Sequence, residues 1–146
     1  MAQTRQARQV LRLTRLLNAA PEAVFDAWTD PASLRAWFQP GAVEVGEIVC
    51  EARPGGTLRI VLQGEHASLV HEGSFVAVER PRLLAFTWRS PATGGADTLV
   101  TIEIAAKGAR STLTLTHEKL PDDRALGLHE SGWNNVLDAL GAHMSA

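Results

Sequence analysis

The chain has 146 residues, 45% of them hydrophobic and 21% charged, proportions typical of a globular protein with its own core. Fourteen basic and sixteen acidic residues give a net charge of −2, so no overall field favours nucleic acid or an anionic membrane as a partner. The single cysteine, Cys50, excludes an internal disulfide, and no run approaches the roughly 18 apolar residues of a membrane span. The polar opening MAQTRQARQ has no apolar signal-peptide core behind it. We therefore expect one cytoplasmic domain over residues 1–146, with a flexible tail at 1–9.

One strand and two short helices are predicted for the first forty residues. Residues 10–17, VLRLTRLL, favour a strand, although their pattern also fits a helix. Pro21 opens a helix in PEAVFDAWTD, and Asp30 followed by Pro31 supplies the N-cap and first position of a second helix. That helix ends before QPG, because proline and glycine do not continue it. The two helices carry large apolar residues on shared faces: Val24, Phe25, Trp28, Leu34, Trp37 and Phe38.

Six segments with β-like alternation follow, at residues 43–52, 57–63, 68–79, 83–89, 98–106 and 111–119. Pro54 and Gly55 match the central positions of a type II turn, and KGAR matches a tight hairpin turn. SPATGGAD is interpreted as a loose loop. Because the other connections are short, the segments are predicted to pair as an antiparallel series.

The last segment, residues 120–146, predicts a long helix capped by Asp122 or Asp123. Its apolar residues recur at three-, four- and seven-residue spacings: Leu126, Trp133, Val136, Leu137, Leu140 and Met144. An antiparallel sheet must cover one apolar face, and this helix is the only predicted element long enough to do so. The sequence therefore predicts an α+β fold.

This order of elements resembles the helix-grip fold of the START-like superfamily, which includes polyketide cyclases, plant hydrophobic-ligand carriers and lipid-transfer domains. Several stretches resemble the branch named for activators of a heat-shock chaperone's ATPase, in its bacterial single-domain form. They are APEAVFDAWTDPASLRAWF, RPGGTLRI, EGSFVAVERPRLLAFTW, TLTLTHE and GWNNVLDAL. The resemblance implies a curved antiparallel sheet wrapped around the C-terminal helix, with two short helices between the first and second strands.

In such a fold a gap often remains between sheet and helix at one end, and the resemblance places ligand-binding candidates there. These are Trp37, Phe38, Phe75, Trp88, His117, His129 and Trp133. His117 ends the alternating apolar row of TLTLTHE, and His129 lies one turn before Trp133. Core packing for the aromatic residues, and a strand-end or solvated position for the histidines, are the alternatives.

Three functions follow as hypotheses, with binding of a small apolar or aromatic molecule in the gap as the leading one. The alternative is a polyketide cyclase-like enzyme that uses His117 or His129 as an acid or base. The third is a protein that contacts a chaperone, which the length of a single domain makes less favoured. We expect no cofactor. We also expect no metal site, because His66 and His71 fall on opposite strand faces.

Overall fold

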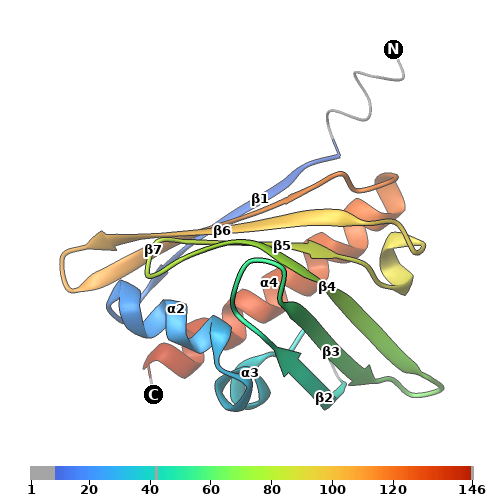
Figure 1. Ribbon diagram of the computed structural model, residues 1–146, viewed down its shortest axis with the longest axis horizontal. Helices are drawn as coiled ribbons and strands as arrows, with labels where there is room; N and C mark the ends of the chain where they lie inside the picture. Colours follow the sequence, from blue (N-terminus) through green and yellow to red (C-terminus); the bar gives the residue numbers. More distant parts are fainter. Residues whose placement is uncertain (1–8, 42, 146) are drawn as a thin grey trace.

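In the computed structural model, the described residues, 9–41 and 43–145, form a seven-stranded antiparallel sheet with helices against one face (Figure 1). The strands are β1 (Leu11–Leu17), β2 (Glu44–Cys50), β3 (Thr57–Gln63), β4 (Ser68–Glu79), β5 (Leu83–Trp88), β6 (Thr98–Lys107) and β7 (Arg110–Glu118). Their order across the sheet is β1-β7-β6-β5-β4-β3-β2, so the first two strands lie at opposite edges. The predicted antiparallel series and helix-grip architecture are confirmed.

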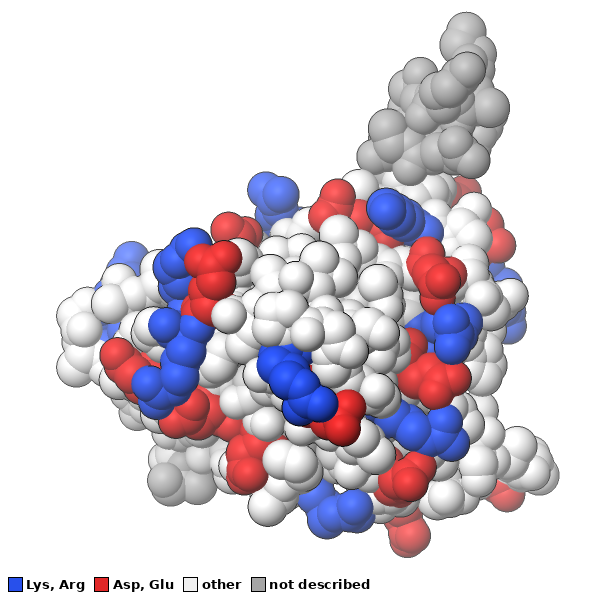
Figure 2. Space-filling view, viewed as in Figure 1, with Lys and Arg blue, Asp and Glu red and all other residues white. Residues whose placement is uncertain are grey.

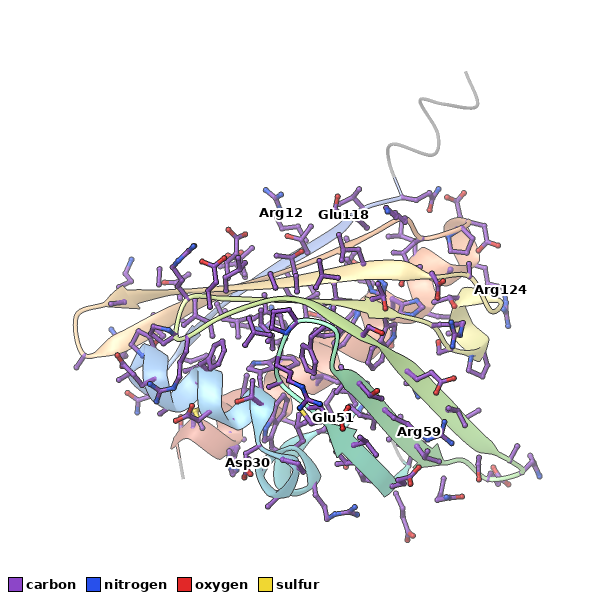
Figure 3. The ribbon with its side chains drawn as sticks, in the orientation of Figure 1. Arg12, Asp30, Glu51, Arg59, Glu118 and Arg124 are labelled. Carbon is purple, nitrogen blue, oxygen red and sulfur yellow. The ribbon has the colours of Figure 1, made fainter. Side chains whose placement is uncertain are left out.

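Two short helices, α2 (Pro21–Thr29) and α3 (Pro31–Trp37), carry the chain from one edge of the sheet to the other. The predicted N-cap is confirmed, because the Asp30 carboxylate accepts a hydrogen bond from the backbone N–H of Ser33 at 3.0 Å. Asp30 also ends α2, where its own N–H donates to the Asp26 carbonyl. One residue therefore fixes the angle between the two helices; Figure 3 labels it.

The turn between β2 and β3 has the predicted type II form. Gly55 has φ +83°, and the N–H of Gly56 donates to the Arg53 carbonyl at 2.8 Å. A Cβ on Gly56 would lie 1.9 Å from the Glu51 carbonyl oxygen, so this position requires glycine. The strands on either side are thereby held in register.

The segment SPATGGAD is more ordered than the sequence predicted. It contains a short 3-10 helix, η1 (Pro91–Thr93), and Thr93 is buried. The Thr93 hydroxyl accepts from the backbone N–H of Ser90 at 3.1 Å and lies 2.9 Å from the Ser90 carbonyl. These short-range hydrogen bonds, which alternation cannot reveal, fix the conformation of the loop that contains η1.

The long helix α4 (Asp123–Ser145) runs along the concave face of the sheet (Figure 1). Asp122 is its N-cap, since its carboxylate accepts from the N–H of Ala125 at 2.8 Å. Two rows of side chains meet between helix and sheet, each member at most 4% exposed: Trp133, Val136, Leu137 and Leu140 from α4, and Val100, Ile102, Ile104, Leu113 and Leu115 from β6 and β7. The predicted stripe therefore faces the core.

Residues 1–8 of the predicted tail lie outside the described residues. Gln9 is described, and it is 5% exposed with its side-chain amide donating to the Asp123 carboxylate at 2.8 Å. The chain is therefore tied to the start of α4 from Gln9 onward. Within residues 9–41 and 43–145, no helix combines the length and the apolar character needed to cross a bilayer.

Many charged side chains of the sheet lie on its convex face, although Arg15 of β1 contacts Asn134 and Asp138 of α4. Arg12 and Glu118 point away from α4 in Figure 3. Arg59 and Arg89 both pair with Glu72, at 2.9 and 3.1 Å. Figure 2 shows basic and acidic groups interspersed over the visible face. Charges of opposite sign thus lie beside one another there.

Replacing Asp30 by alanine tests the junction of α2 and α3. The Asp30→Ala variant loses the cap of α3 and should have a free energy of unfolding lower by about 1 kcal/mol. Urea unfolding followed by circular dichroism measures this. Glu65→Ala, which removes a side chain 88% exposed in the β3–β4 turn, is the control and should change little. Equal midpoints for the two variants would contradict the capping role.

Candidate functional site

A cavity of about 300 Å³ opens between the N-terminal half of α4 and the strands β3, β4 and β5. Its lining residues come from five parts of the chain: Phe38, Pro40, Gly41 and Val43 after α3; Leu62, Leu69 and His71 from β3 and β4; Trp88 from β5; Ala92 from η1; and Leu128, His129, Ser131, Gly132, Trp133 and Val136 from α4. None of these described residues carries a formal charge apart from the titratable imidazoles. The cavity therefore suits an uncharged, apolar guest.

Aromatic rings form the inner wall of the cavity. The ring centroids of Trp88 and Trp133 lie 5.3 Å apart, and Phe38 meets Trp133 edge-on at 6.3 Å. All three are 3% exposed. His71 adds a fourth ring, 5.2 Å from Trp88. These contacts hold the rings in fixed orientations, so the wall is preformed.

Beyond this wall the interior is closely packed. A void of about 10 Å³ lies among Phe75, Phe86, Trp28 and neighbouring side chains, too small for an organic ligand. The core between α2, α3 and strands β3–β5 is therefore filled by side chains, whereas the space on the other side of the aromatic wall is open.

Behind this aromatic wall, His117 of β7 links α4 to the sheet through hydrogen bonds at both of its ring nitrogens. The Trp133 indole N–H donates to His117 Nδ1 at 2.9 Å, and His117 Nε2 lies 2.7 Å from the Thr98 hydroxyl. Since Nδ1 accepts, the proton of the neutral ring is on Nε2, which donates to Thr98. The Thr98 hydroxyl in turn donates to the Trp88 carbonyl at 2.6 Å. Both nitrogens of His117 are therefore occupied.

The environment of His117 keeps it uncharged. The side chain is 0% exposed, and burial, with a smaller effect from His129, lowers the pKa of His117 to about 3. It lies behind Trp133 and His129 and is not among the cavity-lining residues. Its role in this arrangement is to fix the orientation of the Trp133 indole.

His129 does line the cavity. It is 7% exposed, its ring meets His117 edge-on with centroids 4.7 Å apart, and its Nδ1 lies 2.7 Å from the Ala125 carbonyl. Burial lowers the pKa of His129 below its usual value. His71 on the opposite wall is half-buried, with Nδ1 3.2 Å from the Leu69 carbonyl, and burial lowers its pKa too. Within the described residues, no group of three or more histidine, cysteine or acidic side chains is placed to hold a metal ion.

The sequence-predicted site residues fall into two groups. Phe38, Trp88, His129 and Trp133 line the cavity. Trp37, Phe75 and His117 do not.

The packing of Trp37 and Phe75 explains their position. Trp37 packs edge-on against Trp28, with centroids 4.9 Å apart, and its indole N–H donates to the Ala27 carbonyl at 3.0 Å. Phe75 packs against Phe86 at 5.9 Å in the closed part of the core. The paired tryptophans of AWTDPASLRAWF thus join α2 to α3, while Phe38, one residue after α3, reaches the cavity.

The sequence patterns did not predict the small residues that line the cavity. Gly132 and Ser131 on α4 and Ala92 on η1 line the cavity, and a Cβ on Gly132 would meet only the Pro40 Cβ, at 4.0 Å. Asn135 donates to the Pro40 carbonyl at 2.8 Å and so holds the loop after α3 against the helix. Gly132 is not part of the predicted apolar stripe, and a glycine adds nothing to an apolar pattern, so the sequence offered no signal for this part of the cavity.

The sheet gripping a C-terminal helix, with an apolar opening beside it, defines a START-like helix-grip protein. The family model described as activator of Hsp90 ATPase homolog 1-like protein matches residues 18–145, and the chain belongs to this family. No curated protein matches the chain.

Solved structures support the fold. A protein from Chromobacterium violaceum is 24% identical, with 94% of this chain and 98% of that one covered and a TM-score of 0.84. The AHSA1 protein from Silicibacter pomeroyi is 29% identical, with 93% and 97% covered and a TM-score of 0.81. A protein from Rhodobacter sphaeroides is 23% identical, with 93% and 92% covered and a TM-score of 0.81.

Acid should destabilise the protein through its buried histidines. An unfolded histidine binds a proton near pH 6.5, whereas folded His117 does so only near pH 3. Between these values the unfolded state binds more protons, so the free energy of unfolding falls as the pH falls, by up to about 1.4 kcal/mol per pH unit for each such histidine. His129 and His71 add to the effect in the same direction.

The His117→Phe variant isolates this contribution. It should be less stable at pH 7 by about 1–3 kcal/mol, because the buried Trp133 N–H loses its acceptor. Its stability should also depend less steeply on pH below 6.5, as measured by urea unfolding from pH 7 to 4. His66→Phe, which replaces an imidazole 89% exposed, is the matched control and should keep the wild-type slope. If plots of the free energy of unfolding against pH were parallel for wild type, His117→Phe and His66→Phe, His117 would not take up a proton on unfolding.

Proposed function

We propose that this protein binds a small, uncharged, apolar molecule in the cavity between α4 and strands β3–β5. The observation that carries the proposal is the open volume of about 300 Å³ beside the aromatic wall of Phe38, Trp88 and Trp133. On the other side of this wall, among α2, α3 and strands β3–β5, the core is packed to a residual void of about 10 Å³. The opening is therefore local, and small residues, Gly132, Ser131 and Ala92, surround it.

The size and polarity of the cavity suggest the strength of binding. Removing apolar surface from water stabilises a complex by about 25 cal/mol per Å². For a ligand of two or three rings, a binding free energy of roughly 0.5 kcal/mol per non-hydrogen atom corresponds to a dissociation constant in the micromolar range. A charged ligand would lose its hydration without gaining a partner, because no lysine, arginine, aspartate or glutamate is among the described lining residues.

The cyclase-like alternative receives less support. His117 has both nitrogens engaged, which leaves His129 as its candidate acid or base. No aspartate or glutamate of the described cavity lining stands beside His129 to orient or assist it. Chaperone contact remains a prediction from the family resemblance.

The neutral dye N-phenyl-1-naphthylamine, whose fluorescence rises in apolar surroundings, tests the proposal. Wild type should give a saturable rise. Gly132→Leu, which extends a side chain from α4 into the mouth of the cavity beside Pro40, should weaken binding at least tenfold.

Gly127→Leu is the matched control. It makes the same substitution on the same helix, at an exposed position where a Cβ meets nothing within 4 Å and which does not line the cavity. Both changes replace a helical glycine, so neither should lower helix stability. Equal affinities for the two variants, or no saturable signal from wild type, would refute the proposal.

A further inference from the structure

The inference rests on the proposed function and concerns the chemistry of the ligand. It begins with the position of the hydrogen on His129. The Nδ1 atom of this residue lies 2.7 Å from the carbonyl oxygen of Ala125, one turn earlier on α4. A carbonyl oxygen only accepts hydrogen bonds, so Nδ1 carries the hydrogen. Because burial favours the uncharged ring, Nε2 is left with a free lone pair and acts as an acceptor.

This Nε2 atom has no hydrogen-bond partner among the described residues, although the side chain is 93% buried and its ring lines the cavity. Several other polar atoms nearby are already paired. Trp133 Nε1 and both nitrogens of His117 belong to the chain that ends at the Trp88 carbonyl. His71 Nδ1 faces the Leu69 carbonyl; its Nε2 and the Ser131 hydroxyl belong to residues less buried than His129, so water reaches them more easily. His129 Nε2 is thus an unpaired acceptor one helical turn from the Trp133 wall.

We propose that the ligand is a neutral apolar molecule that carries a hydroxyl or N–H donor, which it donates to His129 Nε2 while its hydrocarbon part lies against Trp88 and Trp133. Such a donor satisfies a buried polar atom that an all-hydrocarbon ligand would leave without a partner. A carboxylate is disfavoured, because its oxygens would meet a lone pair and would lose their hydration. Alcohols, phenols and aromatic amines are the compounds that fit, and apolar acids and plain hydrocarbons fit less well.

Three probes with the same ring system separate these cases: 2-naphthol, 2-methoxynaphthalene and 2-naphthoate. Their affinities for the wild-type protein are measured by isothermal titration calorimetry at pH 7.5. We expect 2-naphthol to bind about three- to tenfold more tightly than 2-methoxynaphthalene, which has the oxygen without the hydrogen, and 2-naphthoate to bind most weakly. Equal affinities for the first two, or tightest binding of the naphthoate, would overturn the inference and leave the proposed function standing. Absence of binding by every probe, and by the dye, would remove the proposed function itself.

The variant His129→Phe keeps a ring at this position and removes the acceptor. The preference, measured as the ratio of the affinities for 2-naphthol and 2-methoxynaphthalene, should be lost in this variant, whatever common change the larger ring causes in both affinities. His66→Phe makes the same substitution at an exposed site in the β3–β4 turn and should keep the preference. If the preference persists in His129→Phe, the donor contact is made elsewhere and the inference is wrong.

Nitrogen NMR of the histidine side chains gives a readout that needs no substitution at His129. Adding 2-naphthol to wild type should shift the His129 Nε2 resonance away from that of a free acceptor nitrogen, and 2-methoxynaphthalene should not. The His117 resonances, from nitrogens already paired, should move little with either probe. An unshifted His129 Nε2 at saturating 2-naphthol would overturn the inference.

Discussion

The hydrogen bond from the Trp133 indole to His117 joins the long helix to strand β7 of the sheet, and the shape of the cavity depends on it. His117 holds the indole in one orientation because its other nitrogen is bound to Thr98, which is bound to the carbonyl of Trp88. The two tryptophans of the cavity wall are thus connected through one buried chain of neutral groups. Each member has its partner, so the chain adds rigidity without leaving a buried polar atom unsatisfied.

The parts of α4 on the two sides of this hydrogen bond pack differently against the rest of the protein. Toward its C-terminus, Leu137 and Leu140 are 1% and 0% exposed, and a Cβ on Gly141 would lie 4.0 Å from the Leu17 side chain of β1. Toward its N-terminus, Ser131 and Gly132 of the helix line the cavity, together with residues of the loop after α3 and of η1. The helix is thus bonded to the sheet near its centre, closely packed on the C-terminal side of that bond and bordered by an open cavity on the N-terminal side. Binding is the function that such an opening most directly serves.

Local sequence signals predicted the elements well, because their causes are local. Asp30 and Pro31 cap and start a helix through atoms within three residues, and the alternation in TLTLTHE put Leu113, Leu115 and His117 on one buried face. The family resemblance supplied the topology that these elements adopt. Only some of the cavity-lining residues could be predicted from the sequence. Periodicity assigns a residue to one face of a helix or strand, but it does not say which other residue that side chain will contact.

Trp37 illustrates this limit. Its helix face was predicted correctly, yet its indole turns to the Ala27 carbonyl and away from the cavity. The contact between Trp133 and His117 depends on two elements that meet only after folding. The cavity itself depends on side chains that are small, and a glycine leaves no apolar signal in a sequence pattern.

Diffraction from crystals held under xenon pressure tests the central claim most directly, because xenon enters apolar cavities that already exist and requires no particular functional group. The account predicts a xenon site against Trp88 and Trp133, with the indole of Trp133 still hydrogen-bonded to His117. An interior without xenon, in which side chains from α4 or the loop after α3 fill the space beside these rings, would contradict it.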